Sequence, residues 1–352
     1  MRFFTQANRS RRRLFYAIDD TFFTCIQQAQ AMDIFLQQLL NGLVLGSIYA
    51  LVAIGYTMVY GVLGLINFAH GEVLMIGAMV AFSAITAFLG IYPEAPGWLL
   101  LITGLLAAIP VCMLVSFACE RFAYRPLRNA PRLAPLISAI GLSIVLQTLA
   151  MMIWGRNHLI FPVTLPNEPI TLIQFATTAE MDYQRTVSIT PIQILIVVVS
   201  AVLMFTVAYV VKHTRLGQAM RATAQSTQLA GLMGIPVNAV IAATFIIGAA
   251  LAGVAGVMVA ANYSVAHFYM GFLPGLKAFT AAVLGGIGNI HGAMLGGLLL
   301  GMLESLGAGY LGQLTGGFLG SHYQDIFAFA ILILVLTLRP SGLLGHNTGD
   351  RA

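Results

Sequence analysis

Charged side chains are scarce in this chain of 352 residues. Asp, Glu, Lys and Arg together make up 8% of it, and hydrophobic residues make up 59%. A soluble domain carries about 25% charged and about 45–50% apolar residues. A protein of this size has too few charged residues here to cover a surface exposed to water. The composition excludes a soluble globular protein and predicts an integral membrane protein.

Cysteine and lysine are also rare, and their positions exclude several kinds of chemistry. The three cysteines, Cys25, Cys112 and Cys119, suit neither a disulfide framework nor a metal site. Neither of the two lysines, Lys212 and Lys277, is followed by the Ser or Thr of a phosphate-binding loop. The histidines form no HExxH zinc motif. We therefore expect no catalytic residue, no metal and no cofactor in this chain.

Long intervals without charge indicate where the chain crosses the membrane, since a spanning helix needs about 20 mainly apolar residues. The fold class we predict is an all-α bundle of about eight transmembrane helices, with room for broken or re-entrant segments. The expected spans lie near residues 36–59, 73–90, 98–119, 133–154, 191–211, 237–261, 280–303 and 323–338. Glycines at four-residue spacing, such as Gly42 with Gly46 and Gly297 with Gly301, predict close helix packing.

Basic loops set the expected orientation, because short loops rich in Lys and Arg stay in the cytoplasm. Residues 120–132 hold four arginines, and residues 212–236 hold three basic residues and no acid. The longer polar stretch 156–190 between them is then expected outside. Eight spans place the C-terminus outside as well, unless an additional crossing lies within the glycine-rich stretch 271–303.

The first 31 residues fit this orientation poorly. They carry five arginines and two aspartates, so removing them lowers the formal net charge from +5 to +2. Because the basic excess is concentrated there, we expect no nucleic-acid partner. The sequence from Met32 reads as a natural start, so we predict that residues 1–31 are an upstream extension. The remaining divisions are a transmembrane domain over 32–345 and a tail over 346–352.

Two polar or glycine-rich elements interrupt the apolar runs. The stretch 64–72, GLINFAHGE, is either a polar turn with Glu72 in the first turn of the next helix, or a broken helix lining a pathway. The candidate residues of a pathway or broken-helix element are Asn67, Phe68, His70, Gly71 and Glu72 in this stretch and Gly285, Gly286 and Gly288 further on. Glu304 and Asp325 also adjoin apolar runs, either on the pathway or near helix ends that water reaches.

The loop 212–236 combines basic charge with a short helical stretch of small residues that ends at Gly231, Gly234 and Pro236. One interpretation is an ordinary basic loop. The other is a helix that inserts into the groove of a cytoplasmic partner. The residues by themselves leave both open.

Several stretches make the chain similar to a known family. From about residue 32 to 345 it resembles the LivH-type permeases of bacterial branched-chain amino acid ABC importers. The matching stretches are NGLVLGSIYALVAIGYTMVYGVLGLINFAHGEVLMIGA (41–78), ERFAYRPLR (120–128), LISAIGLSIVLQ (136–147), TRLGQAMRATAQSTQLAGLMGI (214–235), MGFLPGLKAFTAAVLGGIGNIHGAMLGGLLLGMLESL (270–306) and LRPSGLLG (338–345).

The resemblance implies a multi-pass subunit of the bacterial inner membrane that carries leucine, isoleucine or valine. Its implied partners are a second, homologous LivM-like permease, two ABC ATPases that bind ATP and Mg, a periplasmic amino-acid-binding protein and membrane lipid. The resemblance implies that the ATPases bind the region 214–235 of the cytoplasmic loop 212–236. The coupling residues expected there are Arg215, Gly217, Arg221, Ala222, Ala224, Gln225 and Gly231.

Two other transport functions stay open at the level of sequence. Urea or a short amide is as neutral overall as an amino acid, and closely related permeases are assigned to urea. An ion-coupled secondary transporter would need ionisable groups, for which Glu72, Glu304 and Asp325 are available. A membrane-embedded enzyme is disfavoured, because no nucleophile, base and metal ligands occur together.

Overall fold

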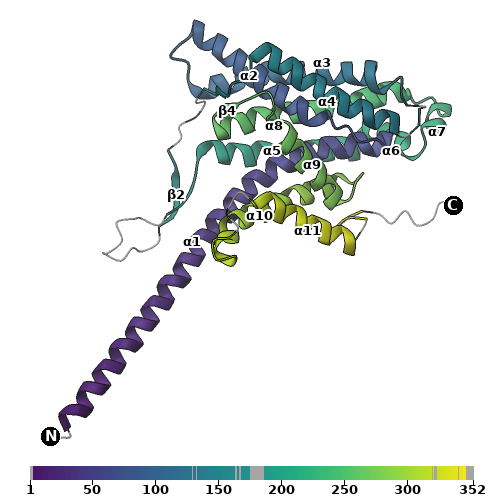
Figure 1. The fold of residues 1–352 in the computed structure, drawn as a ribbon. Coiled ribbons are helices and arrows are strands. Elements are labelled where there is room, and N and C mark those ends of the chain that lie inside the picture. The colour runs from purple at the N-terminus through teal and green to yellow at the C-terminus, as the bar shows by residue number, and fades with distance from the viewer. Residues whose placement is uncertain are drawn as a thin grey trace.

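The chain folds into one bundle of helices with a few short strands (Figure 1). The structure is a computed structural model, and it describes residues 3–128, 130–131, 133–162, 165, 168–174, 186–318, 320, 323–339 and 341–345. The side chains of residues 3–31 are outside this description, and so is the predicted tail 346–352.

The described elements are mainly helical, and the strands form two short antiparallel ribbons, β1 with β4 and β2 with β3. In chain order the elements are α1 (Phe3–Leu63), α2 (His70–Ile91), α3 (Gly97–Ala118), the π-helix η1 (Cys119–Tyr124), α4 (Leu133–Trp154), β1 (Leu159–Ile160), β2 (Ile170–Gln174), β3 (Thr186–Ile189), α5 (Pro191–His213), α6 (Arg215–Gln225), α7 (Thr227–Leu232), α8 (Val237–Tyr263), β4 (Val265–Ala266), α9 (Phe272–Gly285), α10 (Ile290–Leu314) and α11 (Gln324–Leu338).

The predicted class of a multi-span helical membrane protein is confirmed. Among the described residues, seven helical segments are long and apolar enough to cross a membrane, and α9 and α11 are shorter apolar helices. The seven segments are Met32–Leu63, His70–Ile91, Gly97–Tyr124, Leu133–Trp154, Pro191–His213, Val237–Tyr263 and Ile290–Gly312.

The predicted single span 280–303 is wrong, because two helices meet inside it. Between α9 and α10 the chain turns at Gly286 and Gly288, whose φ angles of 105° and 91° do not occur in a right-handed helix. The Asn289 side chain then accepts hydrogen bonds from the backbone of His291 and Gly292, at 3.1 and 3.3 Å. This is the capping pattern that begins a new helix.

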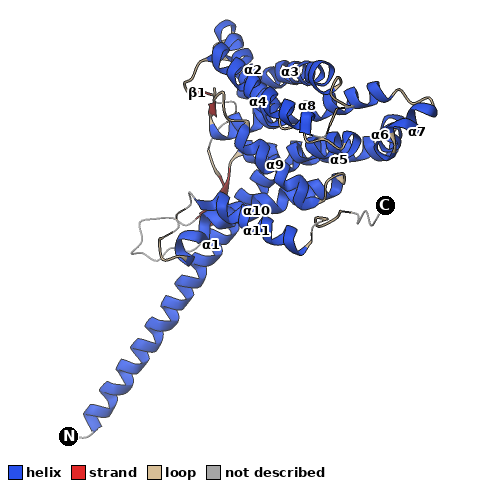
Figure 2. Ribbon diagram, turned by 45° about the vertical axis from the view of Figure 1, so that its right-hand side comes forward, coloured by secondary structure: helices blue, strands red, loops and turns tan. Residues whose placement is uncertain are grey.

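Both basic loops lie at one end of the bundle, as predicted. The Arg128 guanidinium donates to the Asn238 side chain at the start of α8, 2.7 Å away, which joins the loop after η1 to the chain that follows α7. The strands lie at the opposite end from α6 and α7 (Figure 2). Trp154 is at the end of α4 away from these loops, and Trp98 opens α3 there as well.

The described C-terminal residues lie at the end that carries the basic loops (Figure 1), in agreement with the second alternative, an additional crossing within 271–303. The backbone N–H groups of Leu343 and Leu344 donate to the carbonyl groups of Leu284 and Gly285 at the end of α9. The close neighbour of that turn on α1 is Gly61, in the last turn of its helix. Helix α9 is the additional helix that the sequence allowed within 271–303.

The centre of the bundle is the antiparallel pair α1 and α10, and glycine makes its close approach possible. A Cβ atom on Gly297 would lie 2.3 Å from the Ala50 Cα, and one on Gly46 would lie 2.8 Å from the Leu298 Cα. Small residues at such crossings allow helix backbones to touch in lipid. The packing predicted from four-residue glycine spacing is confirmed for this pair.

Large apolar side chains remain exposed on the outer helices. Examples are Leu106 and Leu114 on α3, Ile137 and Met152 on α4 and Phe205 on α5, all between 67 and 71% exposed. A lipid bilayer provides an apolar surrounding for such surfaces, because lipid tails are as apolar as these side chains. These faces of the bundle are therefore suited to contact the hydrocarbon core of a membrane.

Candidate functional site

The loop 212–236 is two consecutive helices, each with its own N-terminal cap. The Thr214 Oγ1 accepts a hydrogen bond from the Gly217 N–H at 3.2 Å and begins α6. The Ser226 Oγ accepts from the Leu229 N–H at 3.2 Å and begins α7. Such caps satisfy backbone groups that a helix start leaves free. The pair forms a projecting element at one end of the bundle (Figure 1).

Two of the candidate coupling residues fasten this element to α5. A Cβ atom on Gly217 would lie 2.2 Å from the Val211 carbonyl oxygen, so only glycine allows the tight turn between α5 and α6. The Arg221 guanidinium donates to the same carbonyl oxygen. These two contacts join α6 to the end of α5.

The other face of the two helices is open. Gly217, Met220 and Thr223 are buried against the bundle. The remaining candidates are exposed, apart from the half-buried Ala222, and they are Arg215, Ala224, Gln225 and Gly231. Two exposed residues at the end of α7 were not among the candidates: Leu232 and Met233, each 83% exposed. The sequence indicated them only as two large apolar residues that lie between Gly231 and Gly234 in a polar loop.

The stretch 64–72 is a break between two helices that is exposed at Gly64 and buried at Asn67 and from Ala69 to Glu72. Gly64, with φ of 67°, follows the last turn of α1. The Asn67 side chain accepts a 2.6 Å hydrogen bond from the Tyr124 hydroxyl in η1. The His70 ring packs edge-on against Tyr56, with centroids 4.8 Å apart, and is 1% exposed. Phe68 packs against a ring of α9, Phe279.

Glu72 lies in the first turn of α2, as one of the two interpretations predicted. Its side chain is also hydrogen-bonded to α4. Its Oε1 accepts hydrogen bonds from the Ser143 hydroxyl at 3.0 Å and from the Gln147 amide at 2.6 Å. Its Oε2 has no hydrogen-bond partner among the described residues. Glu72 lines a small cavity of about 80 Å³ together with Tyr56 and Gly271.

Gly71 and the glycines of the second candidate element lie at opposite ends of α9. At its start, a Cβ on Gly71 would be 2.6 Å from the Gly271 carbonyl oxygen. At its end, Gly285 approaches the Gly292 backbone and Gly286 approaches Gly345. Fourteen helical residues separate these ends, which is about 20 Å. The candidates Gly285, Gly286 and Gly288 therefore form a turn of their own. They do not belong to one site with the candidates of the stretch 67–72.

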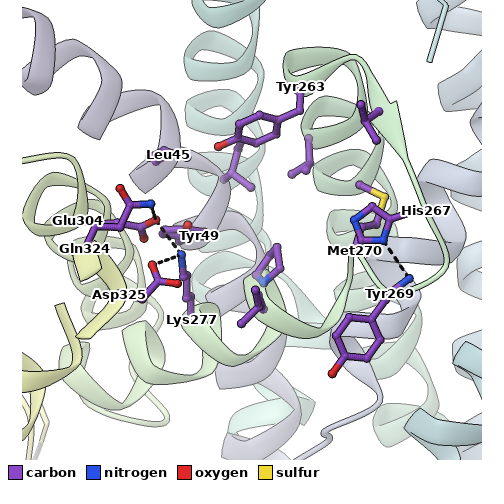
Figure 3. A pocket seen from close by; sticks show the side chains of 15 residues that line it. Leu45, Tyr49, Tyr263, His267, Tyr269, Met270, Lys277, Glu304, Gln324 and Asp325 are labelled. Carbon is purple, nitrogen blue, oxygen red and sulfur yellow. Dashed lines mark hydrogen bonds and ion pairs between the residues drawn. The ribbon is translucent and has the colours of Figure 1, made fainter. Parts of the chain in front are cut away.

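A third site brings together ionisable residues from three helices. The Lys277 ammonium group on α9 lies 2.7 Å from the Glu304 Oε1 on α10 and 2.8 Å from the Asp325 Oδ1 on α11 (Figure 3). The three side chains line a cavity of about 400 Å³. Lys277 was not a candidate in the sequence analysis. Its signal was a lysine between two long charge-free runs, 222–276 and 278–303.

A histidine on the far wall of this cavity adds no positive charge at neutral pH. Burial lowers the pKa of His267 below its usual value, and the neighbouring His158 ring, 4.7 Å away, lowers it further. The neutral ring accepts a 3.2 Å hydrogen bond from the Tyr269 backbone through its Nδ1. Lys277 is thus the cationic side chain among the described residues of the cavity wall.

Comparison with known proteins assigns the chain to a family. The profile of the branched-chain amino acid transport system permease component matches residues 38–336, which is most of the described bundle. The chain belongs to this permease family. It is a transport subunit by that membership, as the LivH-type resemblance predicted.

Several curated relatives match this permease over nearly its whole length. The high-affinity branched-chain amino acid transport system permease protein BraD of Pseudomonas aeruginosa is 49% identical over 314 residues, which are 89% of this chain and 96% of the relative. The LivH protein of Escherichia coli K12, with the same descriptive name, is 46% identical over 312 residues with the same coverage. The ribose import permease protein RbsC of Escherichia coli K12 is 32% identical over 36% of this chain and 40% of its own length. No solved structure matches this permease.

Proposed function

We propose that this permease is one membrane-spanning subunit of an ATP-driven importer for leucine, isoleucine and valine in the bacterial inner membrane. The observation that carries the proposal is the identity of 46 to 49% across 89% of the chain with proteins named for high-affinity branched-chain amino acid transport. The partners we propose are a second, homologous permease, two ATPases that bind ATP and Mg, and a periplasmic binding protein that delivers the amino acid.

The α6–α7 element supports a docking role toward the ATPases. Its helices are capped, it projects from the end that carries the basic loops, and it presents Leu232 and Met233 next to exposed polar residues. A short helix with an apolar tip suits insertion into a groove on a partner. The Arg221 contact with Val211 then transmits ATPase movement to α5. Packed helices respond by switching between discrete arrangements.

Uptake into membrane vesicles tests the proposal. Vesicles containing the complete transporter and the liganded binding protein are loaded with ATP and treated with an uncoupler, and entry of radiolabelled leucine and of urea is compared. We expect ATP-dependent leucine uptake that the uncoupler leaves intact. Uptake of urea but not leucine would overturn the substrate, and uptake that the uncoupler abolishes would indicate ion coupling instead.

A further inference from the structure

The cavity around Lys277 has the size and lining of a small-molecule site. Its volume of about 400 Å³ falls within the usual range of ligand pockets, roughly 300–1,000 Å³. Much of its wall is aliphatic, from the side chains of Leu45, Ile48, Val259, Val265, Met270 and Leu273. The charged side chains gather on one side, where α9, α10 and α11 meet, and His267 lies across the cavity from them (Figure 3). An apolar wall with a few convergent polar groups is typical of binding sites.

The polar side carries one more negative charge than positive charge. Lys277 faces two carboxylates, those of Glu304 and Asp325. The Glu304 Oε1 accepts from the Lys277 ammonium group at 2.7 Å and from the Gln324 amide at 3.5 Å. The Tyr49 hydroxyl also interacts with this carboxylate. The residue as a whole is 3% exposed.

The second oxygen of Glu304 is left without a donor. Its Oε2 is buried and has no hydrogen-bond partner among the described residues. A buried carboxylate oxygen without a donor costs free energy, which a bound donor would recover. The most favourable donor is a cation, because it also balances the excess negative charge.

Tyrosine rings favour the same kind of ligand group. The Lys277 ammonium group lies 5.7 Å from the centroid of the Tyr49 ring, and a second tyrosine, Tyr263, also lines the cavity. Aromatic faces attract ammonium groups and do not attract carboxylates. Lys277, the cation of this wall, is already paired with the Glu304 and Asp325 carboxylates, so an anion would meet a net negative charge here.

We propose that this cavity is a transit site for a free aliphatic amino acid, held by its ammonium group at the Glu304 Oε2 with its hydrocarbon side chain against the aliphatic wall. The inference rests on the proposed function, since the cargo supplies the ammonium group. It assigns to the permease itself a preference for amino acids over urea, in addition to any selection by a binding protein.

Protection of an engineered cysteine tests the site directly. Leu273→Cys, at a half-exposed position on the cavity wall, is introduced together with Cys25→Ser. Cys112 and Cys119 are buried. The full chain is kept in right-side-out vesicles with its partner subunits, without ATP and without binding protein. The rate of N-ethylmaleimide labelling is measured by mass spectrometry as leucine, 3-methylbutan-1-amine, 4-methylpentanoate or urea is added.

The expected result is protection by leucine and by the amine at millimolar concentration, and none by 4-methylpentanoate or urea. Glu304→Gln should raise the half-protecting leucine concentration about tenfold or more, because a charged hydrogen bond is lost. The matched control is Glu94→Gln, which removes an exposed acid away from the cavity and should leave protection unchanged.

Two results would overturn the inference. One is the absence of protection by leucine, and the other is equal protection by leucine and 4-methylpentanoate. Both are read without any Glu304 variant, so a folding defect in that variant does not obscure them. ATP-driven uptake by the same vesicles is a separate measurement, so failure of the transit site can be distinguished from failure of the proposed function.

Discussion

The Arg221 guanidinium in α6 donates a hydrogen bond to the Val211 carbonyl oxygen in the last turns of α5. It connects the projecting α6–α7 element to a helix that crosses the membrane. Carbonyl groups at the end of a helix carry partial negative charge, which a cation stabilises. A residue chosen from the sequence as a contact to the ATPase thus has a contact within its own chain.

Replacing Arg221 with glutamate should uncouple ATP hydrolysis from uptake. The new carboxylate would be repelled by the carbonyl groups at the end of α5, and the α5–α6 connection would loosen. We expect a several-fold fall in amino acid transported per ATP hydrolysed, with normal membrane insertion. Arg221→Lys keeps a cationic donor and is the control. Full transport by the glutamate variant would show that this connection does not transmit the motion.

Serine at both Leu232 and Met233 should weaken ATPase binding without harming the bundle. Each side chain is 83% exposed in the subunit, so its loss costs the fold little. Burial of such a side chain at an interface contributes about 1.5–3 kcal/mol, which is about tenfold or more in affinity. Recovery of ATPase with the purified permease measures the effect.

Phe318→Ser is the matched control for this pair. Phe318 is 85% exposed and follows α10, at the end of the bundle away from α7. Equal loss of ATPase from the control variant, or no loss from the double variant, would contradict the docking role of the α7 tip.

The sequence was sufficient for properties that depend on local composition. Long apolar runs located six of the seven long helices to within a few residues, since each helix must satisfy its own backbone in lipid. Basic residues correctly grouped the loops 120–132 and 212–236 at one end. Four-residue glycine spacing indicated close packing but did not say that Gly297 meets Ala50.

The missed features depend on contacts between distant segments. The turn at Gly286 and Gly288 lies within an apolar run, so a count of hydrophobic residues cannot detect it. The Lys277 site joins α9, α10 and α11 across 48 positions of the chain, and no spacing rule relates such positions. Its one local sign was the isolated charge itself, which intramembrane positions rarely carry without a function.

A side chain at Gly297 should destabilise the bundle at its centre. In Gly297→Ala the new Cβ would lie 2.3 Å from the Ala50 Cα, and backbone atoms cannot move away as a flexible side chain can. Overpacking of this kind costs about 1–3 kcal/mol, so thermal unfolding in detergent should shift downward. Gly90→Ala is the control, because a Cβ there meets no atom within 4 Å. A loss of stability no larger than that of the control would mean that α1 and α10 separate easily.

Removing Lys277 should destabilise the permease far more than removing its partner Glu304. Lys277→Met leaves two carboxylates facing each other without a cation, one of them on a residue only 3% exposed. Breaking a buried pair in this way costs about 3–5 kcal/mol. Glu304→Gln keeps the pair between Lys277 and Asp325, and should cost much less. The double variant removes one charge of each sign, so it should be more stable than Lys277→Met alone.

Thermal unfolding of the four proteins forms a double-mutant cycle. We expect a coupling free energy of about 1–3 kcal/mol between Lys277 and Glu304. Additive losses would mean that the 2.7 Å contact contributes nothing to stability. In that case the lysine would be held by Asp325 alone, and the charge balance on the cavity wall would not depend on Glu304.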